Sequence, residues 1–307
     1  MKHLLCFTFV IFILLILIFN PYTPLSLLHI ARSSHRSKPE PEYPDLIITV
    51  KTTHSYHRTR IPHIVDTWFQ LAPNDIYFIS DSSDTELNQT VGGHLINSHC
   101  ASGHRASALA CKMNRELRVF IEKNAKWSCH FDDDNYVNVP LLKQELLKFD
   151  YNIPYYLGKT STAEPMTIYE GSAGSKPFWF GTGGAGVCLS QAALQKATPR
   201  ILNNGFRTLA GKFRLPDDVT LGFLMVNVLG IELTEMKNFH SHLETLYVIP
   251  VEELQNQPVL SGGTMQYEND NLVAIPYMFE PRQDPLKFRS LHCHLFPEKC
   301  EQQNLIS

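Results

Sequence analysis

The sequence has little charge of either sign and no surplus of basic residues. Charged residues make up 19% of the 307 residues, and 27 Lys and Arg stand against 30 Asp and Glu, for a formal net charge of −3. A nucleic-acid-binding surface normally shows as a basic surplus, so this balance argues against nucleic acid as a partner. Hydrophobic residues make up 44%, which is enough for a packed core and excludes wholesale disorder.

The sequence also lacks the short motifs of several enzyme and metal-binding classes. No P-loop, G-x-S-x-G or H-E-x-x-H motif occurs, and no C-x-x-C pair supports a structural zinc site. The run Gly181–Gly186 formally matches G-x-G-x-x-G, but a dinucleotide site also needs an acidic residue about 20 residues further on. No Asp or Glu lies between Glu170 and Asp217. We therefore reject NAD binding and interpret the run as a close-packed turn, or as a loop where the backbone approaches a ligand.

One long apolar run is present, from Leu4 to Phe19. The residues after it form a poor signal-peptidase site, so we interpret it as an uncleaved transmembrane signal anchor, with a cleaved signal peptide as the alternative. Residues 1–3 would then be a cytosolic tail. Residues 20–44 are rich in proline and have no helical or strand period, which predicts a stem. Residues 45–307 are expected to form one lumenal domain.

Cysteine usage agrees with an oxidising lumen. One cysteine lies in the apolar run, and six lie in the expected lumenal domain, an even number that leaves many pairings open. A glycosylation sequon at Asn88 is consistent with lumenal exposure. Close spacing favours two local bridges, which would leave the two middle cysteines for each other. The pairs favoured in this way are Cys100–Cys111, Cys293–Cys300 and Cys129–Cys188.

Strand and helix patterns alternate through the lumenal part. Runs of β-branched and aromatic residues predict strands, and apolar residues at helical spacing predict helices. This alternation predicts an α/β fold with a largely parallel sheet, in which ligands bind at the carboxyl ends of strands. The predicted strands are Leu46–Thr52, Ile76–Ser80 and Lys126–Phe131, and the predicted helices are Ile61–Leu71, Ala106–Glu122, Leu141–Phe149 and Ser190–Lys196.

Three adjacent aspartates, Asp132, Asp133 and Asp134, directly follow a predicted buried strand. Adjacent carboxylates repel one another unless a cation or a hydrogen-bond donor relieves them. A hard divalent cation takes one or two carboxylates together with substrate phosphates and water. If the chain stays extended, Asp132 and Asp134 share one side and Asp133 points away. Because Asp81 also ends a predicted strand, we expect a ligand site here; a solvated acidic turn is the alternative.

A second acidic pair, Asp217 and Asp218, precedes the apolar stretch Val219–Leu229. Aspartates are normal at the start of a helix, where they cap it and complement its dipole. The functional alternative is a carboxylate held ionised at the helix N-terminus, where it can act as a general base. Further along, His240 and His242 could place both rings on one face of an extended segment. Such a pair is more often structural than metal-binding.

Taken together, these motifs resemble those of the Fringe glycosyltransferases. Their order fits that family from residue 45 to about residue 300, and LPDD with FHSHLE at this spacing is much more specific to it than the other motifs. The matching segments are VKTT (Val50–Thr53), KWSCHFDDDNYVN (Lys126–Asn138), FWFGTGGAGVCLS (Phe178–Ser190), RLPDDVTLG (Arg214–Gly222), FHSHLE (Phe239–Glu244) and FRSLHCHLFP (Phe288–Pro297).

The resemblance implies a GT-A glycosyltransferase fold, a Rossmann-like mixed sheet flanked by helices, in a single-pass type II protein of the Golgi membrane. It implies an O-fucosylpeptide 3-β-N-acetylglucosaminyltransferase that uses manganese (Mn²⁺). Such an enzyme transfers N-acetylglucosamine (GlcNAc) from UDP-GlcNAc, in β-1,3 linkage, to O-fucose on epidermal-growth-factor-like (EGF-like) repeats of Notch-type receptors, and so modulates Notch signalling. The alternatives are a related β-1,3-galactosyl- or glucosyltransferase and a catalytically silent, membrane-anchored binding protein.

By motif position, the resemblance also implies site residues. Asp134 and His242 would bind manganese, and Asp133 would contact the donor. Asp218 would be the catalytic base, and Arg60 would contact the nucleotide sugar. The disulfides of the family fall on the three cysteine pairs that the spacing favours.

Overall fold

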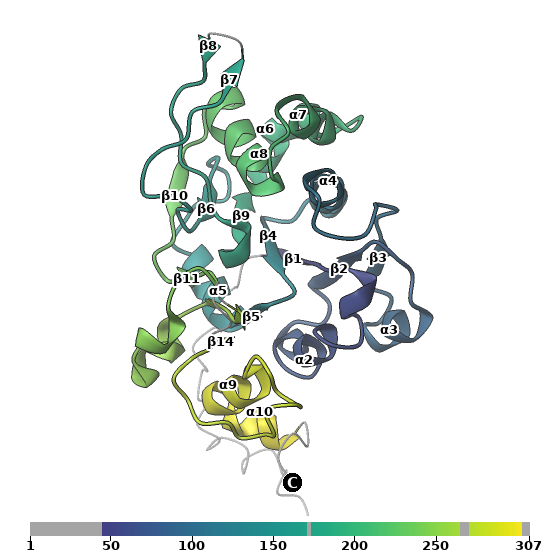
Figure 1. Cartoon of the computed structure of the whole chain (residues 1–307), viewed down its shortest axis with the longest axis vertical. Helices are drawn as coiled ribbons and strands as arrows, with labels where there is room; N and C mark the ends of the chain where they lie inside the picture. The colour runs from purple at the N-terminus through teal and green to yellow at the C-terminus, as the bar shows by residue number, and fades with distance from the viewer. Residues whose placement is uncertain (1–44, 171–172, 265–269, 303–307) are drawn as a thin grey trace, which may run out of the picture. The chain divides into compact units, whose positions relative to one another are not determined.

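The computed structural model describes residues 45–170, 173–264 and 270–302 (Figure 1). The expected tail, anchor and stem, residues 1–44, lie outside these ranges. Within them, no helix has both the length and the apolar character needed to cross a bilayer.

A seven-stranded sheet forms the centre of the described part, in the order β10-β6-β9-β4-β1-β2-β3. Strand β9 runs antiparallel to both of its neighbours, and the other six strands are parallel. The predicted α/β class with a mixed, largely parallel sheet is therefore confirmed. The strands are β1 (Leu46–Lys51), β2 (Ile76–Ser80), β3 (Leu95–Asn97), β4 (Trp127–Asp132), β6 (Tyr156–Gly158), β9 (Val187–Ser190) and β10 (Leu233–Glu235).

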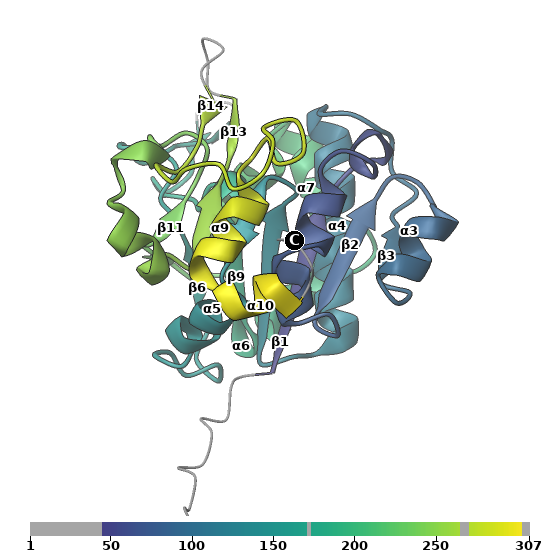
Figure 2. The same ribbon diagram turned by 90° about the horizontal axis from the view of Figure 1, so that it is seen from below.

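Helices cover both faces of this sheet (Figures 1 and 2). The α-helices are α2 (Ile61–Val65), α3 (Thr85–Thr90), α4 (Ala106–Lys123), α5 (Val139–Leu146), α6 (Gln191–Ile201), α7 (Gly205–Phe213), α8 (Asp217–Phe223), α9 (Phe288–Leu295) and α10 (Pro297–Gln302). Shorter helical turns are η2 (His54–Tyr56), η3 (Trp68–Leu71), η4 (Gly183–Ala185), η6 (Leu246–Val248) and η7 (Val251–Asn256), and a π-helical turn, η5 (Leu224–Val228), continues α8.

The side-chain alternation of β1 divides the core into two layers. Leu46, Ile48 and Val50 pack with α2, α5 and α9 on one face. Ile47 packs with α4, α6, α7 and α8 on the other face. Because side chains alternate along a strand, Lys51 at the end of β1 faces the same side as Ile47. This places a cationic side chain on the α4–α8 side of the sheet.

Three predicted helices differ in their bounds by more than one residue from those in the structure. The predicted helix Ser190–Lys196 is α6, which begins after its N-cap Ser190 and continues to Ile201. The predicted helix Ile61–Leu71 is interrupted, because α2 ends at Val65 and a separate 3₁₀ turn begins at Trp68. Thr67 lies between them with φ −124° and ψ −107°, and its hydroxyl bonds a backbone carbonyl of the preceding turn. Such local side-chain bonds compete with continuous helix.

Helix α5 begins earlier than predicted and also ends earlier. The predicted range was Leu141–Phe149, whereas the helix spans Val139–Leu146. The side chain of Asn138 accepts a hydrogen bond from the backbone N–H of Leu141, which makes Asn138 the N-cap. A proline lies in the first helical turn, where its missing N–H costs nothing.

Three smaller, separate sheets are also present in the described residues. Strands β11 (Phe239–His240), β12 (Val259–Ser261) and β5 (Asn135–Val137) form a three-stranded sheet in the order β11-β12-β5. This sheet connects the segment after the acidic triplet to the segment that carries the late histidines. The other two small sheets have two antiparallel strands each. They pair β7 (Tyr169–Glu170) with β8 (Ala173–Gly174) and β13 (Gly263–Thr264) with β14 (Asp270–Asn271).

Three disulfides are present, Cys100–Cys111, Cys129–Cys188 and Cys293–Cys300. These are the pairs that the spacing favoured. The middle pair joins β4 to β9, where the two cysteines face each other in the antiparallel register. It therefore links two central strands that are 59 residues apart in the chain.

Replacing both cysteines of the β4–β9 pair with alanine should destabilise the protein more than replacing both at Cys293–Cys300. The chain-entropy model gives about 4 kcal/mol for a 59-residue loop and about 2 kcal/mol for a 7-residue loop. Urea unfolding under non-reducing conditions measures both free energies. An equal or smaller loss at Cys129–Cys188 would contradict the assigned pairing.

Candidate active site

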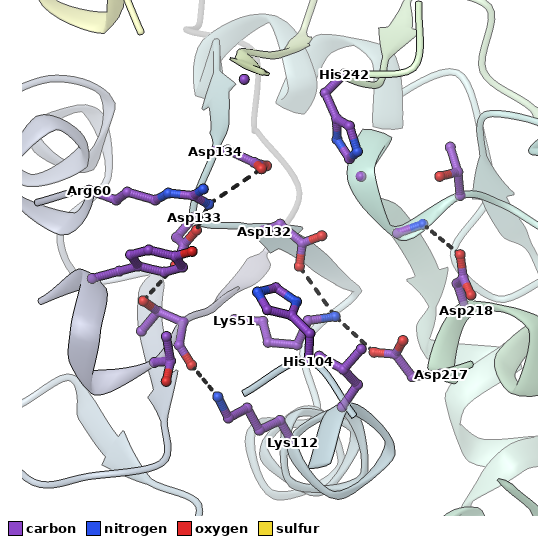
Figure 3. A pocket seen from close by; sticks show the side chains of 18 of the residues that line it. Lys51, Arg60, His104, Lys112, Asp132, Asp133, Asp134, Asp217, Asp218 and His242 are labelled. Carbon is purple, nitrogen blue, oxygen red and sulfur yellow. Dashed lines mark hydrogen bonds and ion pairs between the residues drawn. The ribbon is translucent and has the colours of Figure 1, made fainter. Parts of the chain in front are cut away.

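A pocket of about 520 Å³ opens where β1 and β4 end (Figure 3). Its walls include the residues after β1, the acidic triplet after β4, the glycine run, the start of α8 and the segment after β11. The carboxyl ends of parallel strands are where ligands bind in α/β sheets, as the sequence predicted. The five residues to which the resemblance gave roles all line this pocket: Arg60, Asp133, Asp134, Asp218 and His242.

The acidic triplet turns rather than staying extended. Strand β4 ends at Asp132, whose carboxylate lies 3.2 Å from Lys51 Nζ. Asp133 and Asp134 form the turn before β5, and both face Arg60, with Oδ–Nη1 distances of 2.6 and 3.5 Å. The extended arrangement, with Asp132 and Asp134 on one side, is therefore wrong.

Neighbouring elements hold the two turn carboxylates in place. Asp133 Oδ2 accepts a hydrogen bond from Thr52 Oγ1 at 2.7 Å, and Asp134 Oδ1 accepts one from Ser261 Oγ at 3.2 Å. Burial, together with the adjacent carboxylates, raises the pKa of Asp134 to about 7. Burial also raises the pKa of Asp133, although Arg60 acts in the opposite direction. The turn therefore holds more negative charge than Arg60 alone neutralises.

The glycine run forms part of the pocket wall, and an added Cβ would meet a side chain at less than 3.0 Å at three of its glycines. At Gly181 that side chain is Val187, at 2.9 Å. Gly186 has φ +77°, and a Cβ there would lie 2.2 Å from the ring of Phe131. A Cβ on Gly184 would lie 2.9 Å from the ring of His242. The run is therefore a close-packed turn, which is one of the two interpretations from the sequence, and Thr182, Gly183 and Gly184 line the pocket. The other interpretation, in which the backbone approaches a ligand, stays a prediction.

The second acidic pair begins α8, and its two carboxylates differ in surroundings. Asp217 accepts a hydrogen bond from Lys51 Nζ at 2.8 Å. Asp218 faces the pocket and accepts a hydrogen bond from the backbone N–H of Val219 at 2.8 Å. Burial, and then the charge of Asp217, raise the pKa of Asp218. Pro216 is the N-cap of α8 and makes no side-chain capping bond, so the capping part of the helix-start interpretation is wrong, although both carboxylates lie in the first turn, where they complement the helix dipole. The raised pKa also shows that the helix N-terminus does not by itself hold Asp218 ionised.

The two late histidines do not share a face. His240 Nδ1 lies 3.2 Å from Glu244 Oε2, and its Nε2 lies 3.0 Å from Gln257 Oε1. Both ring nitrogens are therefore used in structural contacts. His242 lines the pocket, and its buried Nδ1 has no hydrogen-bond partner among the residues that the structure describes. The backbone carbonyl of His242 accepts a hydrogen bond from Asn271 Nδ2 at 3.0 Å. This bond anchors the backbone at His242, and the ring packs against Gly184 in the pocket wall.

The pocket is rich in carboxylates. Five aspartates line it, against three cationic side chains, Lys51, Arg60 and Lys112. Within the described ranges, no group of three or more His, Cys, Asp or Glu is placed to hold a metal ion. A cation bound here would therefore take some of its ligands from a bound anion or water.

Sequence reasoning missed the two buried lysines of this site. Lys51 contacts both acidic motifs, and Lys112 Nζ donates to the Asp81 carboxylate at 2.9 Å and to the Thr52 carbonyl at 2.7 Å. A lysine that ends an otherwise apolar strand was the available signal for Lys51. Asp81, which the sequence analysis expected near the site, is not among the residues that line the pocket. It contacts the site through its bond with Lys112, which does line the pocket.

The glycosylation candidate lies away from this set of contacts. Asn88 is in α3, and its side-chain oxygen accepts a hydrogen bond from the backbone N–H of Leu95 at 3.1 Å.

Gly186→Ala should lower the free energy of unfolding by about 1–3 kcal/mol, because it combines left-handed backbone strain with a clash against Phe131. Gly211→Ala is the matched control. Gly211 lies inside α7, where an added Cβ meets nothing within 4 Å. That variant should gain up to about 1 kcal/mol from helix propensity. Chemical denaturation of both variants checks this, and a neutral Gly186→Ala would contradict the packing of the loop.

Comparison with known proteins gives a consistent result. The family model described as Fringe-like matches residues 41–299. The Fringe glycosyltransferase of Drosophila melanogaster is 44% identical over 84% of this chain and 64% of the relative. The β-1,3-N-acetylglucosaminyltransferase lunatic fringe of Danio rerio is 40% identical over 83% of this chain and 69% of the relative. The β-1,3-N-acetylglucosaminyltransferase lunatic fringe of Homo sapiens is 38% identical over 83% of this chain and 68% of the relative.

The chain spans less than two thirds of the length of the Drosophila relative. Among solved structures, the glycosyltransferase GlyE of Streptococcus pneumoniae TIGR4 aligns with a TM-score of 0.46 at 15% identity, over 84% of this chain and 64% of that chain. The family match and the sequence identities agree with the motifs gathered in the pocket. The chain belongs to the Fringe family.

Proposed function

We propose that this protein is an inverting glycosyltransferase that adds GlcNAc from UDP-GlcNAc, in β-1,3 linkage, to O-fucose on EGF-like repeats of Notch-type receptors. Relatives in the family are named β-1,3-N-acetylglucosaminyltransferase lunatic or radical fringe. The observation that carries the proposal is that one pocket contains Arg60, Asp133, Asp134, Asp218 and His242 together. The proposed fold type is GT-A.

The pocket suits a divalent cation, which we propose to be Mn²⁺. The excess of carboxylates, the raised pKa of Asp134 and the unpartnered Nδ1 of His242 all fit a bound cation. Asp134 and His242 would hold the ion. When bound, it would neutralise negative charge on the diphosphate leaving group.

The residues of the chain supply the remaining steps. Arg60 and Asp133 contact the donor and orient it at the pocket wall. Asp218 removes the proton from the fucose 3-hydroxyl as that oxygen attacks the anomeric carbon from the face opposite UDP. A single displacement converts the α-linked donor to a β-linked product without a covalent intermediate. Burial and Asp217 raise the pKa of Asp218 toward the range of an effective proton acceptor.

The proposed location is the Golgi membrane. Residues 1–3 would be cytosolic, residues 4–19 would span the membrane, residues 20–44 would form the stem, and the catalytic domain would be lumenal with Asn88 glycosylated. The three disulfides support an oxidising compartment for the domain.

Asp218→Asn should leave the fold and donor binding intact and lower kcat at least 100-fold, since general-base catalysis contributes about 10²–10⁴ in rate. Steady-state transfer to an O-fucosylated repeat measures kcat, and calorimetry with UDP in the presence of Mn²⁺ checks the donor site. Turnover at the wild-type rate would refute Asp218 as the base.

Asp134→Ala should abolish the part of UDP binding that depends on Mn²⁺. Titration of UDP with and without the metal separates that part from direct contacts. Asp150→Ala, at an exposed aspartate after α5, is the control and should bind as wild type does. If Asp134→Ala keeps a metal-dependent gain in affinity, another residue holds the ion.

A further inference from the structure

Two aspartates of the pocket have no contact with donor, acceptor or metal in the proposed reaction, although the charge of Asp217 helps to raise the pKa of Asp218. Asp132 opens the acidic triplet, two residues before Asp134, and Asp217 opens α8, immediately before Asp218. A buried carboxylate without a counter-charge is costly, so each of these residues needs an explanation.

One lysine contacts both of them. Lys51 Nζ lies 2.8 Å from Asp217 Oδ2 and 3.2 Å from Asp132 Oδ1, and the Lys51 side chain is 10% exposed. Figure 3 shows Lys51 between the two carboxylates. The contact joins the carboxyl end of β4 to the N-terminus of α8, segments that are far apart in the sequence.

A second set of bonds holds the strand residues that precede Lys51 and Asp132. In the pairing of β1 with β4, Lys51 lies opposite Asp132, and Thr49 lies opposite His130. The fully buried Glu116 of α4 accepts a hydrogen bond from Thr49 Oγ1 at 2.7 Å and contacts His130 Nδ1 at 2.6 Å. One helix side chain therefore ties both strands together two residues before each strand ends. The end of β1 has little freedom to move Lys51 away from its partners.

We propose that Lys51 is a positioning residue for the glycosyl transfer proposed above. It holds the acidic turn and the start of α8 at a fixed separation, and so sets the distance between Asp134, which anchors the donor side, and the base Asp218. Displacements of about 1 Å at reacting groups can cost about 100-fold in rate. This inference rests on the proposed function and adds a role for the lysine of the VKTT segment.

Lys51 could instead serve stability alone, and the two roles predict different kinetics. A stabilising ion pair changes the folded fraction and leaves kcat per folded molecule unchanged. A positioning clamp lowers kcat per folded molecule and leaves donor binding largely intact, because Arg60, Asp134 and His242 remain.

The test is a double-mutant cycle with Lys51→Met and Asp217→Ala. Asp217→Ala breaks the clamp at α8 while Asp132 still pairs with Lys51, so this variant should fold even if Lys51→Met does not. Each single variant should lower kcat at least tenfold, with the UDP–Mn²⁺ dissociation constant within about threefold of wild type. Because Asp217 also raises the pKa of Asp218, kcat is compared at the plateau of each variant's pH profile, where a changed pKa of the base no longer matters. If the two residues act as one unit, the double variant should lose no more than the worse single variant.

Lys143→Met is the matched control, because Lys143 pairs with Asp75 at 2.9 Å outside the pocket. Its kcat should equal that of wild type. Unchanged kcat in folded Asp217→Ala, or losses that multiply in the double variant, would overturn the positioning role while leaving the transferase proposal standing. Absence of transfer by the wild-type protein would overturn both.

Discussion

Five carboxylates share one pocket with three cationic side chains, and this imbalance constrains the rest of the site. Carboxylates that line the same pocket repel one another strongly once they are removed from water. The protein meets the constraint in two ways. Lys51 pairs with both Asp132 and Asp217, the first residues of the two acidic motifs, and so offsets part of their charge. Arg60 neutralises the turn only in part, which leaves Asp134 with a raised pKa and a site that favours a cation.

The backbone brings these groups together by strand pairing. The parallel register of β1 with β4 sets Lys51 beside Asp132. The small sheet β11-β12-β5 starts from the segment after the triplet and reaches the segment before His242. The glycine run then closes the pocket, because Gly184 leaves space for the His242 ring. A site that extends in sequence from Lys51 to His242 is thus held by two sheets and one turn.

Much of this arrangement could be predicted from local patterns. Runs such as Leu46–Lys51 and Ile76–Ser80 combine apolar and β-branched residues, so their strands and the place of the site at the strand ends followed from the sequence. A turn was one of the two interpretations of the acidic triplet. The contact that fixes Asp133 and the break at Thr67 could not be predicted, because both depend on side-chain bonds to a particular partner. The partners of Lys51 and His240 also depend on residues far away in the chain.

The central claim is the identity of the transferred sugar and of its acceptor. The most direct measurement incubates the purified protein with Mn²⁺, a mixture of UDP-sugars and an O-fucosylated EGF-like repeat, and reads the product by mass. We expect a gain of one N-acetylhexosamine that requires both the metal and the fucose. A gain of a plain hexose would contradict the proposed donor, and no gain with any donor would contradict the proposed transfer.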